Sequence, residues 1–424
     1  HNARKARSPV VSIVGEHATR HLKVDAPLTS DVAAFARTVS DSVRTARSAD
    51  DVGPAAAETI AAAWGPPGAV AMLIVPADYS WSETEIVGPA IARPAPCTPS
   101  DHAIDRARRA LSEPGTAILL GGMAVSAHAL EAAGRTGARV MTARNVAKIA
   151  WGRGRFPAPQ IPYFPEAALP FLADVKRLIT VEADAPVSFF AYPDTPSYMA
   201  PGGCEIIELA RRGEDGTAAL LALGAKTAAA PHVPAANLPC SDSEDLTLDS
   251  LGHALAPLIP EDALIADEMV SSAGKILAWL ATAAPHEFMP VTGGSIGQGL
   301  PVALGAAVAC PSRKVIALEA DGSGMYTLQA LWTMARCHLD IAVVILANRR
   351  YRILDIEMKR TGANALGPLA NEMIDIGNPR LDWVGLSEGC GVPATRARTA
   401  REFREQFKDA VQQKGPRLIE AVLT

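Results

Sequence analysis

The chain has 424 residues, of which 49% are hydrophobic and 20% are charged, and its formal net charge is −5. The apolar content excludes a disordered chain, and the length exceeds that of one ordinary domain, so a globular protein of three domains is expected. The slight negative charge disfavours nucleic acid as a partner. The six cysteines form no C-x-x-C pair, so they indicate neither a zinc site nor a disulfide framework and suit a reducing cytoplasm. The sequence contains no run of about 18 apolar residues, so no membrane span is predicted.

Short apolar runs followed by turn residues alternate with alanine-rich stretches, a pattern typical of buried parallel strands and covering helices. The predicted fold class is therefore α/β, with three doubly wound parallel-sheet domains. The first domain has strands at 10–15 and 70–78 around a helix at 49–64, and a proline-rich linker follows at 88–101. We assign residues 1–87 to this domain and expect it to be incomplete at its N-terminus, because the chain starts abruptly in a helix-like stretch without methionine.

The second predicted domain covers residues 100–228 and continues the alternation after a helix at 101–111. Its strands are expected at 115–122, 138–143, 178–184 and 186–193. A second polar linker at 228–250 leads into the third domain, residues 245–424. Strands of the third domain are expected at 262–268, 286–292, 314–320, 340–348 and 416–423.

Two polar residues end neighbouring strands of a predicted βαβ unit in the third domain. Asp321 follows the strand at 314–320, and Asn348 ends the strand at 340–348, 348 − 321 = 27 positions later. Because the carboxyl ends of parallel strands meet at one edge of a sheet, both side chains are expected to face a common point. Carboxylate and amide oxygens suit Mg²⁺ or Ca²⁺, and Mg²⁺ with few protein ligands is usually completed by water and phosphate oxygens. The pair therefore predicts a site for a metal and a diphosphate.

The residues after Asp321 support an anion at the same point. Gly322, Ser323 and Gly324 let the backbone approach a ligand closely, and they lead into a predicted helix at 326–337 whose free N–H groups favour an anion. The same turn is also a common connection between a strand and a capped helix. The distant asparagine in its βαβ context favours the interpretation as a binding site.

An acidic-Gly-Ser sequence at one strand end, followed by Asn at the next, resembles the signature of thiamin diphosphate-dependent enzymes that act on 2-keto acids. That signature is usually GDG followed by NN, and here it is ADG and AN, with Ala320 and Ala347 at positions that do not hold the metal. The resemblance implies a thiamin diphosphate cofactor and Mg²⁺. The implied metal ligands are Asp321, Asn348 and the backbone oxygen of Arg350.

The same resemblance assigns the cofactor contacts. Segment 292–310 is similar to the part of the family in which a bulky apolar residue, here Ile296, holds thiamin in a bent conformation. A backbone carbonyl two residues earlier, here that of Gly294, accepts a hydrogen bond from the 4′-amino group of the cofactor. The bend brings this amino group next to the thiazolium carbon that must lose a proton. The other implied contacts of the cofactor are Ser271, Ser295, Gly322, Ser323 and Tyr326.

Residues 1–87 are similar to the later half of the pyrimidine-binding domain in the acetolactate synthase and benzoylformate decarboxylase group. The family activates thiamin with a glutamate from the earlier half of that domain, so this glutamate is expected upstream of His1 and the catalytic residues stay unknown. His17 and His21, at the end of the first predicted strand, remain open between a role toward the substrate and that of ordinary solvated histidines. Arg349 and Arg350 remain open between binding an anionic substrate group and facing solvent.

The expected function is decarboxylation and carboligation of 2-keto acids, dependent on thiamin diphosphate and Mg²⁺ and similar to that of the acetolactate synthase large subunit. Simple decarboxylation of the benzoylformate type is the alternative within the family, and a catalytically silent cofactor-binding or regulatory protein is the alternative of another class. The resemblance also implies a homodimer or homotetramer with active sites at the subunit interface. Bound FAD, which some acetolactate synthases contain, stays undetermined, and the expected location is the cytoplasm.

Overall fold

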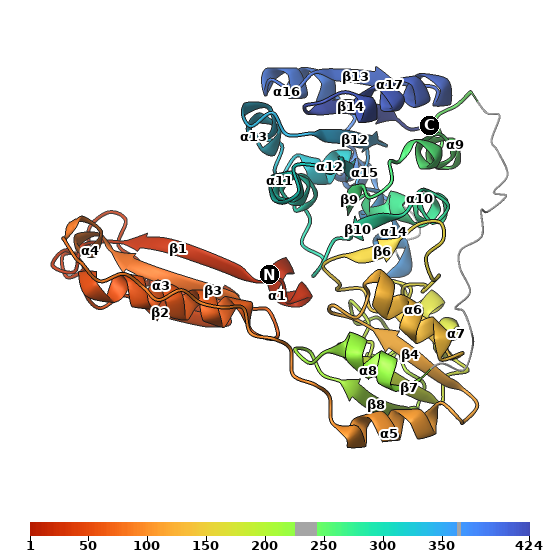
Figure 1. Ribbon diagram of the computed structural model, residues 1–424. Helices are drawn as coiled ribbons and strands as arrows, with labels where there is room; N and C mark the ends of the chain where they lie inside the picture. Colours follow the sequence, from red (N-terminus) through yellow and green to blue (C-terminus); the bar gives the residue numbers. More distant parts are fainter. Residues whose placement is uncertain (225–243, 363–365) are drawn as a thin grey trace.

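The chain forms three mainly parallel sheets covered by helices, which confirms the α/β class (Figure 1). The computed structural model describes residues 1–224, 244–362 and 366–424. Most of the predicted linker at 228–250 therefore lies outside the described residues. In the part of the chain that is described, no helix is both long and apolar enough to cross a membrane.

The first sheet is parallel and has the strand order β1-β3-β2. Its elements are α1 (Asn2–Ala6), β1 (Val10–Glu16), α2 (Val32–Val39), β2 (Ser42–Thr45), α3 (Ala49–Trp64), β3 (Val70–Pro76) and α4 (Ala77–Trp81). Helix α3 has the predicted bounds because the Ser48 hydroxyl caps it by accepting the N–H of Asp51. Strand β1 lies at an edge, and Ile13 on it is 73% exposed.

The second sheet is parallel and has the order β5-β4-β7-β8. Its elements are α5 (Asp101–Ala110), β4 (Thr116–Leu120), α6 (Ala127–Arg135), β5 (Arg139–Thr142), α7 (Pro165–Leu172), β7 (Arg177–Val181), β8 (Glu205–Ala210) and α8 (Gly216–Ala222). The strand predicted at 186–193 is wrong, and this segment is a loop with one isolated bridge, Val187 to Tyr198. A proline stands at each end of the segment and supplies no N–H for the hydrogen bonds of a sheet. The aromatic rings of the segment pack against one another instead.

The third sheet has seven strands in the order β13-β14-β12-β11-β9-β10-β6, and only β6 is antiparallel to its neighbour. The strands are β6 (Ile149–Trp151), β9 (Leu264–Glu268), β10 (His286–Met289), β11 (Val315–Ala320), β12 (Ile341–Ala347), β13 (Ala394–Ala397) and β14 (Arg417–Val422). The five strands predicted for this region are confirmed as β9, β10, β11, β12 and β14. Strands β6 and β13 were not predicted.

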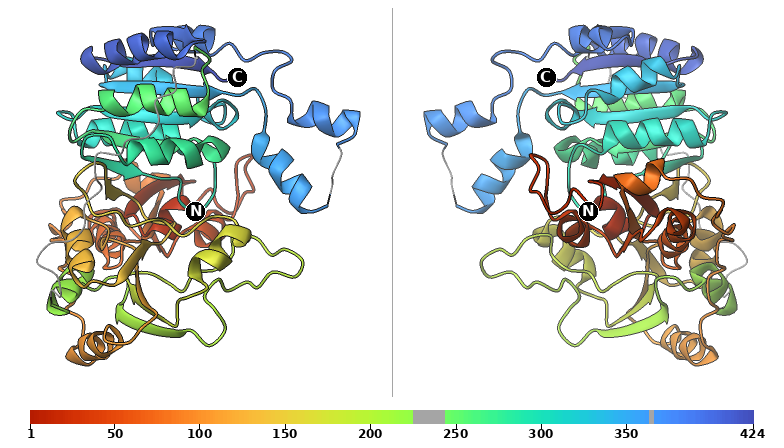
Figure 2. Two further views of the ribbon diagram at one scale, coloured as in Figure 1. Left: turned by 90° about the vertical axis from the view of Figure 1, so that its right-hand side faces the viewer. Right: turned by 90° about the vertical axis from the view of Figure 1, so that its left-hand side faces the viewer.

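Helices cover this third sheet, and they differ from the prediction next to Asp321. They are α9 (Leu248–Leu255), α10 (Ala273–Leu280), α11 (Gly299–Ala309), α12 (Asp321–Gly324), α13 (Ala330–Arg336), α14 (Arg352–Arg360), α15 (Pro368–Ile374), α16 (Trp383–Gly389) and α17 (Ala400–Gln412), with short 3₁₀ turns at Ala256–Leu258 and Val270–Ser272. The helix predicted at 326–337 is present as α13, but it begins four residues later than expected, at Ala330, and α12 is a separate short helix before it. The Thr327 hydroxyl donates to the Gly297 carbonyl at 3.0 Å, which holds the chain in a turn between them. Figure 2 shows α14 and α15 projecting from the rest of this layer.

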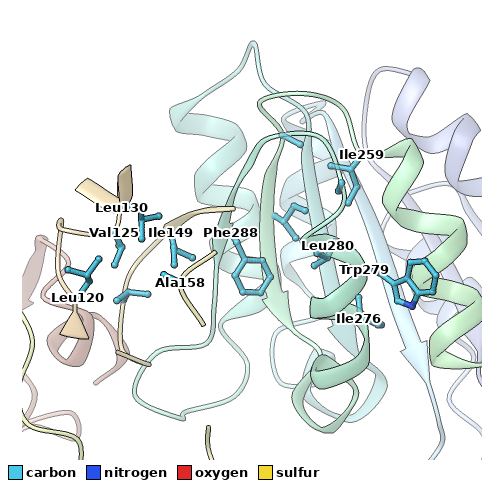
Figure 3. Close-up of a cluster of buried hydrophobic side chains, with 14 of the residues drawn as sticks. Leu120, Val125, Leu130, Ile149, Ala158, Ile259, Ile276, Trp279, Leu280 and Phe288 are labelled. Atoms are coloured by element: carbon cyan, nitrogen blue, oxygen red, sulfur yellow. The ribbon is translucent and has the colours of Figure 1, made fainter. Parts of the chain in front are cut away.

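The second and third sheets share one hydrophobic core. Strand β6 pairs with β10, with Ile149 opposite Phe288. The buried cluster around this pair extends from Leu120 in the second sheet to Ile276 and Trp279 over the third (Figure 3). Because apolar surface of both layers is removed from water at this joint, it holds the two sheets together. The first sheet instead projects away from them, and α1 lies where it meets the third sheet (Figure 1).

Candidate functional site

The ends of β9 and β11 form the point where the third sheet changes direction. From β9 the chain goes to β10 on one side and then returns to β11 on the other side. In open α/β sheets, ligands bind at such a point, beyond the carboxyl ends of the strands. The predicted parallel pairing of β11 with β12 is confirmed, with Ala320 opposite Leu346. Asp321 and Asn348 therefore leave the same edge of the sheet.

A hydrogen bond links the two strand ends directly. The Asp321 carboxylate accepts the backbone N–H of Arg349 through Oδ2 at 2.6 Å and that of Gly322 through Oδ1 at 3.0 Å. Asn348 Oδ1 accepts the N–H of Arg350 at 2.9 Å, which orients the amide at the turn. Each of these oxygens retains a second lone pair for a cation.

The electrostatics of Asp321 suit a metal ion. The side chain is 3% exposed, and burial raises the pKa of this carboxyl group to about 6 although two backbone N–H groups act against the rise. A divalent cation would supply the positive charge that favours the ionised form. Beside it, Nε and Nη2 of Arg349 are buried and have no hydrogen-bond partner among the described residues, so an anion such as a diphosphate would satisfy them. On both counts the residues present fit a metal with a diphosphate.

No cluster of three or more His, Cys, Asp or Glu side chains suited to a metal occurs among the described residues. This result is compatible with the predicted ligands, which combine one carboxylate with an amide and a backbone carbonyl. Mg²⁺ characteristically takes few protein ligands of this kind and completes its octahedron with other oxygens.

The turn formed by α12 is packed too tightly for larger residues. A Cβ atom added to Gly322 would lie 2.5 Å from the Tyr351 ring, and one added to Gly324 would lie 2.8 Å from the Trp383 ring. The Ser323 hydroxyl donates to Glu319 Oε1 at 2.5 Å, so this side chain points into the protein rather than toward a ligand. Tyr326 is 63% exposed at the end of the turn. Of these residues, Ser323 is left with only its backbone for contact with an anion.

The loop 292–298, which carries Gly294, Ser295 and Ile296, is fixed by residues from three other parts of the chain. Asn2 in α1 donates to the Ser295 carbonyl at 2.6 Å and accepts the Ser295 N–H at 3.2 Å. Asn145 accepts the N–H of Gly293 at 2.9 Å. Ile296 remains 42% exposed at the tip of the loop. The apolar side chain is therefore held outside the core in an ordered loop.

Glu268, the last residue of β9, holds the far end of this loop. Its carboxylate accepts the N–H of Gly299 at 2.5 Å and also that of Gly297. Glu268 is fully buried and lies opposite Glu319 across the pairing of β9 with β11. Burial raises the pKa of Glu268, and burial together with the nearby Glu268 carboxylate raises that of Glu319 well above its usual range. Two buried carboxylates thus lie directly beneath the candidate site.

The sequence pattern does not predict the roles of Asn2, Asn145 and Glu268. Each makes contacts with residues far along the chain, and none belongs to a recognised motif. The one available signal was Glu268, because an acidic residue ends an otherwise apolar strand at the edge where ligands bind.

The remaining predicted residues occupy different positions. Ser271 lies in the 3₁₀ turn that follows β9, at the same sheet edge as Asp321. The guanidinium group of Arg350 donates to Asn371 at 2.9 Å, so it is engaged within the protein. His17 and His21 follow β1, with their rings 5.4 Å apart, in a cavity of about 540 Å³. Within one chain this end of the first sheet lies apart from the third sheet (Figure 1).

Comparison with known proteins adds a family assignment to this geometry. The family model described as "Thiamine pyrophosphate enzyme, C-terminal TPP binding domain" matches residues 272–421. The chain is 42% identical to the "Putative acetolactate synthase large subunit IlvX" of Mycobacterium tuberculosis, over 100% of this chain and 83% of that protein. It is 26% identical to the benzoylformate decarboxylase of Pseudomonas aeruginosa, over 99% of this chain and 83% of that one.

Solved structures show the same fold. The thiamine diphosphate-dependent 4-hydroxybenzoylformate decarboxylase of Rhodococcus jostii RHA1 superimposes with a TM-score of 0.84 at 23% identity, over 100% of this chain and 84% of that one. The structure described as that of "a putative thiamin diphosphate-dependent enzyme isolated from Mycobacterium smegmatis" superimposes with a TM-score of 0.79 at 21% identity, over 100% of this chain and 84% of that one. At these identities the likeness concerns the architecture of the sheets.

Proposed function

The chain belongs to the family of thiamin diphosphate-dependent enzymes, and from this premise we propose that it decarboxylates a 2-keto acid and transfers the product to an acceptor, as an acetolactate synthase large subunit does. The observation that carries the proposal is the meeting of Asp321 with the Asn348–Arg350 turn at the point where the third sheet changes direction. Bound thiamin diphosphate supplies the electron sink for decarboxylation. The chain's own part is to hold, orient and shield the cofactor.

The proposed metal ligands are the carboxylate of Asp321, the amide oxygen of Asn348 and the backbone oxygen of Arg350, and the metal is Mg²⁺. Arg349, whose Nε and Nη2 are buried without a hydrogen-bond partner among the described residues, is added as a group that would face the anion. The remaining diphosphate contacts are assigned to Ser271, Gly322, Ser323 and Tyr326, with Ser323 acting through its backbone because its hydroxyl is bonded to Glu319.

Loop 292–298 is proposed to receive the pyrimidine half of the cofactor. The Gly294 carbonyl would accept its 4′-amino group, Ser295 would line the site, and the exposed Ile296 side chain would support the bend between its two rings. Preorganised contacts of this kind are effective only in a fixed loop. The hydrogen bonds from Asn2 and Glu268 supply that rigidity.

A second subunit is proposed to complete the site. The His17 and His21 cavity lies at the carboxyl ends of the first sheet, apart from Asp321 of the same chain. In a homodimer or homotetramer, this cavity of one subunit would face the third sheet of another. Arg20 and the two histidines in it suit the carboxylate of a 2-keto acid. The division into domains 1–87, 100–228 and 245–424 remains part of the proposal, and it has to allow for β6 (Ile149–Trp151) of the second range, which pairs with β10 in the third sheet.

One observation favours the benzoylformate type as a second candidate. The Phe189 ring lies against Gly294, where an added Cβ atom would be 2.1 Å from Cζ of Phe189. The ring centroids of Tyr163 and Phe190 lie 5.0 and 4.9 Å from the ring centroid of Phe189. Aromatic side chains beside the loop favour an aryl substituent on the substrate. Product analysis separates the two: acetolactate from pyruvate supports the first, and benzaldehyde alone from benzoylformate supports the second. Cofactor binding without turnover of either substrate would indicate the catalytically silent protein instead.

A further inference from the structure

The second sheet has its own point where the chain changes direction, between the ends of β4 and β7. From β4 the chain goes to β5 on one side and then to β7 on the other. This edge is where an α/β domain would bind the phosphates of a dinucleotide, with backbone N–H groups from glycine-rich turns as donors. Gly121 and Gly122 follow β4, and α8 begins at Gly216 beside them. The geometry of a phosphate site is therefore present.

A side chain of the protein occupies this position. Glu182, which follows β7, is 6% exposed and accepts the N–H of Met123 at 2.9 Å through Oε2. Its Oε1 accepts the N–H of Gly216, the first residue of α8, at 3.3 Å. These are the backbone donors that the phosphate of a ligand would need, and both are already bound to an anionic group.

The surrounding backbone leaves no room for a second anion. A Cβ atom added to Gly122 would lie 2.3 Å from Glu182 Oε2, and one added to Gly216 would lie 2.6 Å from Oε1. At Gly121 an added Cβ atom would lie 2.6 Å from the Glu182 carbonyl. We call this enclosure of Glu182 by Gly121, Gly122, Met123 and Gly216 the carboxylate cradle.

The backbone of Glu182 is strained to place its carboxylate there. Its φ angle is +51°, in the left-handed region that costs a residue with a side chain roughly 1–3 kcal/mol. Glycine would adopt this conformation without that cost. A glutamate at such a position, with both carboxylate oxygens bound to backbone N–H groups, shows that the strain is balanced by the contacts of the carboxylate.

We propose that Glu182 permanently fills the phosphate position of the second sheet, and that this domain consequently binds no FAD or other dinucleotide. The inference is independent of the proposed function, because the carboxylate cradle and the candidate thiamin diphosphate site lie on different sheets. It distinguishes this chain from acetolactate synthases that contain FAD.

The first experiment uses the unmodified protein, loaded with Mg²⁺ and thiamin diphosphate. FAD is titrated, and binding is followed by the quenching of its fluorescence and by the flavin that remains after gel filtration. The expected result is no saturable quenching and no retained flavin. Saturable FAD binding with one flavin per chain would overturn the proposal, whatever the variants do.

The second experiment opens the carboxylate cradle. Glu182→Gly removes the carboxylate and also the left-handed strain, leaving two buried N–H donors free for inorganic phosphate. We expect millimolar phosphate to raise the melting temperature of this variant by at least about 2 °C and that of the wild type by less. Asp194→Gly is the matched control, because Asp194 is also left-handed, with φ +57°, but exposed. An identical response of Glu182→Gly and Asp194→Gly to phosphate would overturn the assignment of the cradle.

Discussion

Glu268→Gln should weaken thiamin diphosphate binding although Glu268 does not face the cofactor. The substitution keeps the shape of the side chain, but it leaves one acceptor where Gly297 and Gly299 present two N–H donors. One hydrogen bond to a charged group is lost, at about 1.5–3 kcal/mol, and a buried donor is left unpaired. Removing a charge next to Glu319 offsets part of this cost, because that pair is repulsive. We therefore expect Glu268→Gln to destabilise the fixed conformation of loop 292–298 by about 2 kcal/mol.

If the loop must be fixed for the cofactor to bind, a loss of about 2 kcal/mol corresponds to a roughly 30-fold higher Kd. The assay is calorimetric titration of thiamin diphosphate at saturating Mg²⁺. Glu420→Gln is the matched control, because Glu420 is 1% exposed in the same sheet and pairs with Arg396 at 2.8 Å. The control should lower stability without changing the Kd. Equal affinities in the two variants would refute the role given to Glu268.

Three further predictions concern the same site and the core beside it. Asn2→Ala removes both contacts with Ser295, so the Kd for thiamin diphosphate should rise about tenfold; an unchanged Kd would show that α1 does not fix the loop. Burial raises the pKa of Asp321 to about 6, and Mg²⁺ needs the ionised carboxylate. Mg²⁺-dependent binding of thiamin diphosphate should therefore weaken as the pH falls through about 6. A constant affinity from about pH 7 to 5 would contradict this prediction. Burial lowers the pKa of His286 from 6.5 to about 4, so stability is full above about pH 6.5 and falls by roughly 3 kcal/mol as the pH drops toward 4. His286→Leu should flatten this acid-side decline in the melting temperature, and an unchanged slope would exclude His286 as its cause.

The strands of the third sheet were predictable because they are buried on both faces. Such strands are continuous apolar runs, as at Ile341–Ala347, where every residue is buried. The segment at 186–193 is also mainly apolar, but it packs its aromatic rings against one another in a loop, and the prolines at its two ends are the signal that it is not a strand. Strand β6 has three residues and pairs with a strand more than a hundred positions away, so no local pattern marks it.

In the candidate site, too, contacts within one local unit could be predicted and contacts between distant parts of the chain could not. Asp321 and Asn348 were predictable as neighbours because one βαβ unit connects them, and the handedness of that unit fixes which strand ends meet. The contacts of Asn2 with Ser295 depend on how the first and third sheets are placed, over 293 positions of sequence. The helix expected at 326–337 begins only at Ala330, because the Thr327 hydroxyl donates to the Gly297 carbonyl and holds the preceding residues in a turn. Local rules thus predicted that the proposed metal ligands Asp321 and Asn348 lie close together, but not which residues hold loop 292–298.

The most direct test of the site is calorimetric titration of thiamin diphosphate with and without Mg²⁺, comparing the wild type with Asp321→Ala. Asp340→Ala is the control, because Asp340 lies at the opposite end of β12, where it pairs with Lys314 at 2.7 Å. The wild type and the control should bind the cofactor only with Mg²⁺, and Asp321→Ala should not bind it measurably under either condition. Binding by Asp321→Ala with unchanged affinity and unchanged Mg²⁺ dependence would contradict the assignment of this sheet edge as the diphosphate site.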